Sequence, residues 1–431
     1  MDIIKKGTLI QNNTTLAGID IGSAKCCCSI GKINYETGKI KLLGIGESQS
    51  TGMKKGSIVN RDQVIEEIES AVMDAESMAH MKIDRANITI SGNHIRGLNT
   101  QGTIAIHTNG YGQIPNAQPI QPKDIHKVLD MARAISFPID RNILHVIPQE
   151  YIIDTMEGVI NPIGMTGRRL EARVHLITVA ISSLTNIKDC VEESGISVDE
   201  IIYQGLASAL SVITNDEKEM GVAVIDIGAD TSDLVVFHDG GVRHSAVIPI
   251  GGNSITSDIA MMLQISTAEA EKIKNKYGSA IASMASTELE FELPSENGHL
   301  KRSISEHELS RYIEARAGEI LQYIAKEISR ADMDGPLTYG IVLTGGGSQL
   351  NHLAKLSENE LNIKTRIGIP SNCGNVIDLG SEPKYAASLG LLNWKEFIQN
   401  ERVLLNGSSG SFGGKMKEWV EGISNWSKGF F

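Results

Sequence analysis

Two stretches of the chain share one pattern, an apolar run that ends in Asp-Ile-Gly. Leu16–Ser23 reads LAGIDIGS and Val222–Ala229 reads VAVIDIGA. Short apolar runs are typical of buried strands, and each run continues through small or polar residues into a second strand-like run, KCCCSIGKI or DLVVFHDGG. A strand, a tight glycine turn and a second strand form a β-hairpin. The repetition predicts a fold of two similar halves.

A third pattern joins an apolar run to three glycines. Gly340–Gly347 reads GIVLTGGG, and LNHLAKL follows with helical spacing. A glycine-rich turn between a strand and a helix can bring backbone N–H groups close to a ligand. Apolar positions also recur at helical spacing in Arg61–Met78 and Ile187–Ser194. Because strands and helices alternate, the sequence predicts an α/β protein.

Two segments differ in composition and pattern from the parts of the chain in which strands and helices alternate. Residues 87–171 contain frequent glycine and proline, one predicted helix at Lys123–Ala134, and strand-like ends. This segment is interpreted as an insertion. Residues 253–335 are mostly helical in pattern, with a charged strand-like piece at Glu288–Leu293, and are interpreted as a separate unit.

The last residues form a distinct tail. Residues 406–414, NGSSGSFGG, read as a flexible linker. In residues 415–431 the apolar side chains follow the i, i+3, i+4, i+7 spacing of an amphipathic helix. We expect this helix to lie in a membrane interface, with docking on the protein's own core as the alternative. Its apolar face consists of Met416, Trp419, Val420, Ile423, Trp426 and Phe430.

Composition narrows the class of function. The 431 residues carry a formal net charge of −12, which argues against nucleic-acid binding through a basic surface. No apolar run approaches the roughly 18 to 20 residues that span a bilayer, and the first residues are too polar for a secretory signal, so we expect a cytoplasmic protein. Five cysteines, three of them consecutive at Cys26–Cys28, are interpreted as buried apolar residues. No histidine spacing supports a zinc site or a Ser/His/Asp triad.

Two Asp-containing hairpins that face each other across a cleft predict a phosphate clamp. Tight glycine turns expose several backbone N–H donors together, and aspartates at strand ends can hold Mg²⁺ through its waters. We assign Mg²⁺ binding to Asp20 and Asp226. Lys25 is expected to add positive charge next to the phosphates. The first turn comprises Gly22, Ser23 and Ala24, the second Gly228, Ala229, Asp230 and Thr231, and the turn under the nucleoside Gly345, Gly346 and Gly347.

The order of hairpin, long spacer, hairpin and GGG turn resembles the superfamily of actin, sugar kinases and the 70-kDa heat-shock ATPases. Five ordered motifs resemble, more specifically, the bacterial cell-division FtsA family. The resemblance covers about residues 15 to 398 and returns at the tail. The motifs are HVIPQEY (His145–Tyr151), NPIGMTGRRLEARVHLIT (Asn161–Thr178), GLASALSVIT (Gly205–Thr214), DIGADTSDLVVF, and VIPIGGNSITSDIA (Val247–Ala260).

This resemblance implies an actin-like two-lobed fold with an FtsA-type inserted subdomain and a C-terminal amphipathic helix. The implied lobe 1 core comprises residues 1–86 with the first phosphate hairpin, 172–204 and 379–405, interrupted by the insert at 87–171. The implied lobe 2 core comprises 205–252 with the second hairpin and 336–378 with the GGG turn, interrupted by an outer subdomain at 253–335. The linker at 406–414 and the membrane-targeting helix at 415–431 complete the chain.

The resemblance also implies an ATP site. AEKIKNKYG (Ala270–Gly278) resembles a family segment in which Glu271 and Lys274 would contact the ribose and adenine. Gln204 takes roughly the place of a water-orienting glutamate in ATPase relatives, and a neutral amide is a poor base, so we expect slow hydrolysis at most. Asp230 stands where many members of the family have glycine.

The implied role is to join FtsZ filaments to the membrane. Members of the family form actin-like filaments, tether FtsZ to the cytoplasmic face of the inner membrane at the septum, and help to recruit later division proteins. The outer subdomain would face FtsZ, with Glu314 and Arg316 in YIEAR as candidate contacts. Two alternatives stay open: an actin-like assembly ATPase of a pilus or secretion machine, and a sugar or carboxylate kinase.

Overall fold

The structure is a computed structural model of the chain, and it describes residues 15–33, 40–106, 117–293, 302–331, 335–371, 373–374 and 381–406. The predicted membrane-facing side chains, Met416 to Phe430, lie outside the described residues, as does nearly all of the predicted linker. In the described part of the chain, no helix combines the length and apolar character needed to cross a bilayer.

The first predicted hairpin forms the centre of a six-stranded sheet in lobe 1. Strands β1 (Thr15–Ile21) and β2 (Lys25–Ile33) pair antiparallel, and β3 (Ile40–Gln49) follows. The parallel strands β6 (Arg85–Ile90) and β13 (Ser197–Tyr203) extend one side of the hairpin. The strand order is β13-β6-β1-β2-β3-β21, with β21 at Cys373–Gly374.

Helices cover both faces of this sheet, and the three consecutive cysteines show the alternation of the buried faces. Cys26 and Cys28 pack in the cluster that includes Ile68 of α1 (Arg61–Ala79), whereas Cys27 packs with Leu389 of α10 (Ala386–Asn406). Successive strand residues point to opposite faces, which explains the division. The three thiols are free and buried, as expected of small apolar core residues.

The second predicted hairpin forms the centre of the lobe 2 sheet. Strands β14 (Val222–Ile227) and β15 (Ser232–His238) pair antiparallel, β16 (Gly241–Ile248) continues the meander, and β19 (Ile341–Thr344) pairs parallel with β14. With β20 (Thr365–Ile367) the order is β16-β15-β14-β19-β20. In each lobe the Asp-Ile-Gly strand therefore lies between its antiparallel partner and one parallel strand, which confirms the predicted repetition.

A helix pair joins the two lobes. Helix α4 (Gln204–Val212) begins directly after β13 and packs against α10. The packing is so close that a Cβ at Gly390 would lie 1.7 Å from the carbonyl oxygen of Ala207. Only glycine is compatible with this approach of the two backbones. Helix α3 (Ile181–Glu193) packs against α1 and β13, and α5 (Asn215–Met220) packs against β15.

The inserted segment folds into its own sheet with one covering helix. The strand order is β10-β9-β12-β7, and helix α2 (Pro122–Arg133) matches the predicted helix to within a residue at each end. The sheet extends to Ala180 because β12 pairs along its length with β7 and β9, whereas β6 still belongs to lobe 1. The insert thus begins and ends a few residues later than 87–171. Its strands are β7 (Arg96–Ala105), β9 (Arg141–Ile153), β10 (Met156–Val159) and β12 (Arg169–Ala180), with a small β8–β11 pair (Gln118–Pro119 and Thr166–Gly167).

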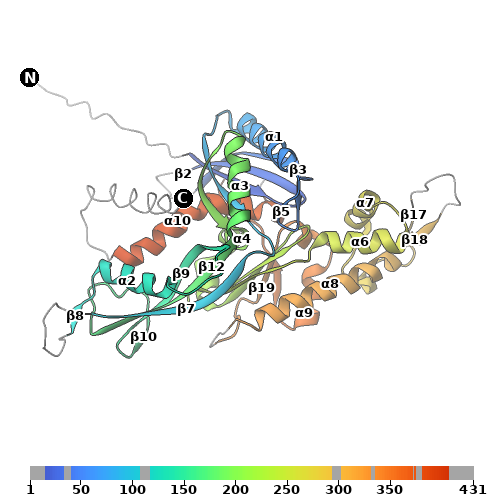
Figure 1. The fold of residues 1–431 in the computed structure, drawn as a ribbon. Coiled ribbons are helices and arrows are strands. Elements are labelled where there is room, and N and C mark those ends of the chain that lie inside the picture. Colours follow the sequence, from blue (N-terminus) through green and yellow to red (C-terminus); the bar gives the residue numbers. More distant parts are fainter. Residues whose placement is uncertain are drawn as a thin grey trace, which may run out of the picture.

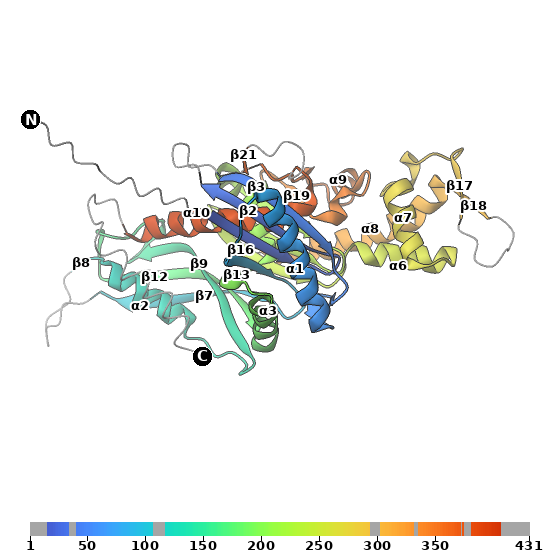
Figure 2. The same cartoon turned by 90° about the horizontal axis from the view of Figure 1, so that it is seen from above.

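The outer subdomain of lobe 2 is mostly helical, as predicted. Its helices are α6 (Gly252–Leu263), α7 (Thr267–Tyr277) and α8 (Glu306–Ile328), and the charged strand-like piece forms β17 (Glu290–Glu292), paired with β18 (Ser303–Ser305). This subdomain and the insert project at opposite ends of the molecule in both views (Figures 1 and 2).

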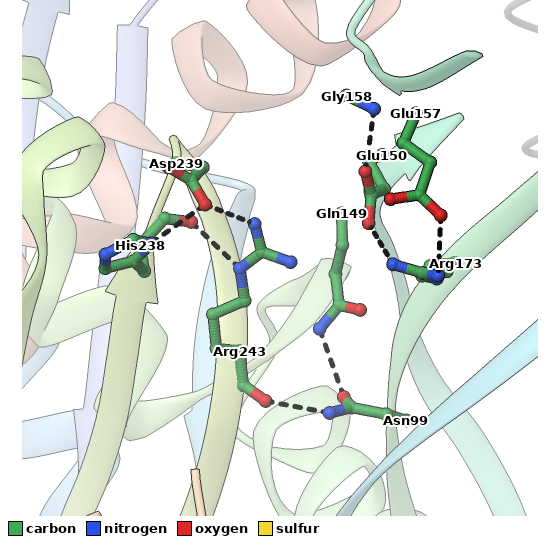
Figure 3. Close-up of polar contacts among 9 residues, drawn as sticks. All are labelled: Asn99, Gln149, Glu150, Glu157, Gly158, Arg173, His238, Asp239 and Arg243. Carbon is green, nitrogen blue, oxygen red and sulfur yellow. Dashed lines mark hydrogen bonds and ion pairs between the residues drawn. The ribbon is translucent and has the colours of Figure 1, made fainter. Parts of the chain in front are cut away.

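The insert is covalently continuous with lobe 1, but its sheet hydrogen-bonds to strand β16 of lobe 2. Asn99 Nδ2 donates to the carbonyl oxygen of Arg243 (3.0 Å), and Gln149 Nε2 donates to that of Val242 (2.7 Å). Figure 3 shows Asn99 lying between Gln149 and the backbone of Arg243. Below them, His175 lies between Asn99 and Ser245. We call this contact the insert junction.

Candidate nucleotide-binding site

A cavity of about 430 Å³ lies between the two lobes, where the turns of the β1–β2 and β14–β15 hairpins meet. The structure brings together around it every side chain and glycine that the sequence assigned to the nucleotide, together with Gln204. The nucleotide-assigned residues come from four separated stretches of the chain, and Gln204 from a fifth. They are Asp20, Gly22, Ser23, Ala24, Lys25, Asp226, Gly228, Ala229, Asp230, Thr231, Glu271, Lys274, Gly345, Gly346 and Gly347.

The first phosphate turn is a tight hairpin with a buried carboxylate at its base. The Gly22 N–H donates to the carbonyl oxygen of Lys25 (3.0 Å), which closes the turn. Asp20 is only 5% exposed, and Thr89 Oγ1 donates to its Oδ1 (2.7 Å). Burial raises the pKa of Asp20, although the nearby Lys25 ammonium and the Thr89 hydroxyl oppose this rise.

The second phosphate turn repeats this design with different partners. The Gly228 N–H donates to the Thr231 carbonyl oxygen (2.8 Å), and the Asp226 carboxylate accepts from Ser208 Oγ (2.5 Å) and Gln204 Nε2 (3.4 Å). Burial raises the pKa of Asp226 to about 6; the hydrogen bond from Ser208 lowers it and the Asp20 carboxylate raises it further. Two buried carboxylates on one cavity are a suitable oxygen donor set for a cation.

Lys25 is the one cation among these residues that lacks a protein partner in the described part of the chain. Its Nζ is buried and makes no hydrogen bond there, and it lies 4.7 Å from the centroid of the Tyr385 ring. Burial opposes the charged form, but the acidic groups of Cys27, Asp20 and Glu47 outweigh it and raise the pKa of Lys25. A buried ammonium without acceptors is costly, and phosphate oxygens would supply those acceptors.

Helix α7 contributes an ion pair to the lining of the cavity. Lys274 Nζ lies 2.7 Å from Glu271 Oε2 and donates to Thr256 Oγ1 (2.8 Å). The two side chains are three residues apart and therefore share one face of the helix. On that face they line the same cavity as the two hairpin turns.

The close approach of Gly345 to Asp226 explains why the GGG turn contains glycine. Gly345 has a positive φ of 81°, and a Cβ there would lie 2.0 Å from Asp226 Oδ1. The turn continues as a short 3₁₀ helix (Gly346–Gln349), and the predicted helix begins later, as α9 (Leu353–Leu361). A side chain at Gly345 would displace the carboxylate, so this turn requires glycine.

Several residues that support the site had no assignment from the sequence, and of Thr89, Ser208 and Ser91 only Ser91 lines the cavity. Thr89 and Ser208 each donate to one of the two aspartates, and Ser91 Oγ donates to the buried Asp233 (2.6 Å). Ser208 could have been found, because it lies one helical turn after Gln204 on the same face of α4. Thr89 belongs to a parallel strand from a distant part of the chain, and nothing in its local sequence indicates a role.

The described residues contain no group of three or more His, Cys, Asp or Glu side chains arranged to hold a metal ion directly. Asp20 and Asp226 are buried carboxylates that line the cavity. A metal held there through water molecules and phosphate oxygens requires only such an incomplete protein set. The residues present are therefore compatible with Mg²⁺ that arrives with a nucleotide.

The two candidate partner residues lie on α8 and are both engaged within the protein. Glu314 Oε2 accepts from the Ala282 N–H (2.9 Å). The Arg316 guanidinium forms two hydrogen bonds to Asp258 of α6 (2.5 and 3.0 Å) and also pairs with Glu319. These contacts hold α8 against α6 and against the turn at Ala282, which follows α7.

Comparisons with known proteins identify the family to which this chain is similar. The family model "Cell division protein FtsA" matches residues 223–390, and the model "SHS2 domain inserted in FTSA" matches 92–178. Cell division protein FtsA of Pseudomonas aeruginosa is 37% identical over 422 residues, which cover 96% of this chain and 99% of the relative. The Escherichia coli K12 protein of that name is 34% identical, with 95% and 97% covered.

The chain belongs to the FtsA family. Solved structures confirm the actin-like α/β fold expected of an FtsA protein. The PilM–PilN type IV pilus biogenesis complex aligns with a TM-score of 0.62 at 16% identity, covering 88% of this chain and 97% of that one. MreB5 of Spiroplasma citri bound to ADP aligns with a TM-score of 0.53 at 14% identity, covering 91% and 99%. The SHS2 match corresponds to the inserted sheet, which agrees with the later start and end of the insert.

Proposed function

We propose that this FtsA-family chain binds Mg-ATP in the cleft, polymerises on the cytoplasmic face of the inner membrane, and tethers FtsZ filaments to it at the septum. The observation that carries the nucleotide part is the constellation at the phosphate end. Two buried aspartates and the buried Lys25 Nζ, which has no hydrogen-bond partner among the described residues, face one cavity between two repeated glycine turns. Phosphate oxygens and a hydrated cation satisfy all of these groups together.

In this proposal each group has a role set by its position. Lys25 and the N–H groups of both turns bind phosphate oxygens, and Asp20 and Asp226 hold Mg²⁺ through its waters. A metal held there would neutralise phosphate charge. Glu271 and Lys274 contact the ribose and adenine, and the GGG turn passes beneath the nucleoside. MreB5 of Spiroplasma citri, a distant structural neighbour, has been solved with AMPPNP.

Hydrolysis is proposed to be slow. Gln204 lies beside Asp226, where its amide can orient a water molecule. An amide takes up a proton poorly, so it cannot serve as an efficient general base. The chain is therefore proposed to use ATP mainly as a ligand that controls assembly.

The membrane and partner roles rest on the family and on the tail pattern. The apolar face from Met416 to Phe430 is proposed to insert into one leaflet, and the outer subdomain, with Glu314 and Arg316 on α8, to face FtsZ. Membership of a cell-division family, with relatives at 34–37% identity, favours this role. Pilus assembly is suggested only by a structural neighbour with 16% sequence identity. No observation favours a sugar or carboxylate kinase.

A thermal-shift titration with Mg-ATP tests the nucleotide part. A ligand at a hundredfold excess over its Kd stabilises a protein by about 2.7 kcal/mol. Asp226→Ala should remove most of this stabilisation, and Asp74→Ala, an exposed aspartate of α1, should keep it. No response to Mg-ATP in the unmutated protein would contradict the proposed site.

Co-sedimentation with vesicles that contain anionic lipid tests the membrane part. Deletion of residues 412–431 should abolish sedimentation and leave the melting temperature unchanged. Trp419→Glu should act in the same direction, because burying a large apolar side chain contributes about 1.5 to 3 kcal/mol. If the deletion instead lowers the melting temperature and leaves vesicle binding intact, the tail docks on its own protein.

A further inference from the structure

A short hairpin of lobe 1 reaches across the mouth of the cleft. Strands β4 (Met53–Lys54) and β5 (Ser57–Ile58) pair in register, which leaves a two-residue turn of Lys55 and Gly56. Both turn residues have positive φ angles, 51° and 74°. This is the pattern of a type I′ turn, which matches the twist of a two-residue hairpin. The tip of the hairpin therefore has a fixed conformation.

The base of this hairpin is anchored to lobe 1 by one buried carboxylate. Glu67 of α1 is 8% exposed, and its Oε1 accepts from the backbone N–H groups of Thr51 and Gly52 (2.5 and 3.0 Å). Its Oε2 accepts from Ser50 Oγ (2.9 Å). A carboxylate with this many donors holds its segment firmly, so the hairpin moves with α1 and the lobe 1 sheet.

The tip is hydrogen-bonded to lobe 2 at the second phosphate turn. The backbone N–H of Lys55 donates to Asp230 Oδ2 (2.8 Å). The other oxygen of the same carboxylate accepts from Asn253 Nδ2 (2.9 Å), and the Asn253 N–H donates to the carbonyl oxygen of Ala229 (2.8 Å). Asp230 is thus held in place by its own lobe while it accepts a donor from the other lobe.

The same tip also approaches the first phosphate turn. The Gly56 N–H lies 3.4 Å from Ser23 Oγ, and Ser23, Gly56 and Asp230 all line the cavity. The hairpin tip and the two phosphate turns therefore enclose the phosphate end of the cleft. Separation of the lobes at this end must break the bond between Lys55 and Asp230.

We propose that Asp230 is a positioning residue that clasps the β4–β5 hairpin across the cleft and slows the release of bound nucleotide. This inference rests on the proposed binding of ATP. Its physical basis is a hydrogen bond to a charged acceptor, which is stronger than one between neutral groups. Loss of such a bond during opening corresponds to about tenfold faster release.

A simple electrostatic role for Asp230 predicts the opposite sign. A carboxylate near the phosphates repels them, so its removal would make the nucleotide bind more tightly and leave more slowly. The direction of the change in release rate therefore distinguishes a clasp from a repelling charge.

The test measures release of the fluorescent analogue mant-ATP, loaded with Mg²⁺ and chased with excess unlabelled ATP in a stopped-flow instrument. Asp230→Ala should release the analogue about tenfold faster than the unmutated protein. Asp230→Asn should restore most of the slow release, because its amide oxygen still accepts from the Lys55 N–H. Lys55→Ala is the matched control: it keeps the backbone donor, so its release rate should stay within about twofold of the unmutated protein.

A second measurement reports the contact itself without nucleotide. Hydrogen exchange at the Lys55 amide should become faster in Asp230→Ala and stay near its original rate in Asp230→Asn and Lys55→Ala. Normal mant-ATP binding with unchanged or slower release in Asp230→Ala would overturn the clasp and leave the proposed function standing. Failure of the unmutated protein to bind mant-ATP would overturn the proposed ATP site, and the role in release with it.

Discussion

The nucleotide cleft and the insert junction both bury titratable side chains at a contact with lobe 2. They differ in how these side chains are paired by hydrogen bonds. At the junction, His175 is 1% exposed and lies between two partners, Asn99 Oδ1 (2.6 Å) and Ser245 Oγ (2.7 Å). Neutral imidazole with its proton on Nδ1 satisfies both contacts. In the cleft, Lys25 Nζ has no hydrogen-bond partner among the described residues, and two carboxylates face the same cavity.

This difference separates a contact that is complete within the chain from one that a ligand completes. Buried polar groups stabilise a fold only when they are paired, so the junction contributes to stability by itself. In the proposed function, phosphate oxygens and a cation would pair with the cleft groups. Mutations in the two regions should therefore affect different quantities, ligand binding in one and the free energy of unfolding in the other.

The largest effect is expected at Lys25. Lys25→Met should abolish most of the roughly 2.7 kcal/mol of stabilisation that a hundredfold excess of Mg-ATP provides. The free energy of unfolding without nucleotide should change by less than about 1 kcal/mol, because methionine keeps the apolar packing and removes a buried charge. Denaturant titrations with and without Mg-ATP measure both quantities. Lys32→Met, at the other end of β2, is the control and should leave both unchanged.

A somewhat smaller effect is expected from acid at the junction. Burial, with a smaller contribution from His244, lowers the pKa of His175 to about 3. The folded-state pKa is thus below the unfolded value of about 6.5. The stability from neutral His175 is present above pH 6.5 and is lost as the pH falls toward 3, by about 2 kcal/mol at pH 5.

Denaturant titrations at pH 7 and pH 5 check this prediction, with His175→Gln as the comparison. Glutamine offers a donor and an acceptor but does not titrate, so its loss of stability between the two pH values should be smaller. An equal loss in both proteins would assign the acid sensitivity to other groups.

The smallest effect is expected at the exposed part of the junction. Gln149→Ala removes the donor to the Val242 carbonyl and to Asn99 Oδ1, leaves His175 paired with Asn99, and affects a contact that water can reach. We expect a loss of about 1 kcal/mol in the free energy of unfolding. Stabilisation by Mg-ATP should remain unchanged. Asn142→Ala is the control, because the Asn142 side chain bonds only to the neighbouring Ile143 N–H among the described contacts. A similar loss there would remove the special role of Gln149.

The sequence predicted the cleft better than the junction for a physical reason. Each phosphate hairpin is encoded in one short window, where an apolar run, an aspartate and a glycine turn follow one another, so local patterns suffice. Asn99 and Gln149 read as ordinary polar residues of half-exposed strands. Their role depends on the edge strand β16, which lies far along the chain, and no local pattern reports it.

The limits of helices show the same dependence on local signals. Helix α1 begins at the predicted residue, where the Asn60 side chain accepts from the Gln63 N–H and caps it. Helix α3 begins at Ile181, six residues before the predicted start, directly after β12 and without a side-chain cap at Ala180. Without a capping residue or a break in the apolar run, the sequence did not indicate this start.

Helix α10 extends from the region beside Lys25 toward the insert. Its first residues adjoin Tyr385, beside Lys25, and its 21 residues extend about 30 Å from there to Asn406. Along this path α10 contacts α2 of the insert, and the outer subdomain projects at the far end of the molecule (Figure 1). A membrane bound by the residues after Asn406 would therefore lie on the side of the insert. The outer subdomain would then point away from the lipid.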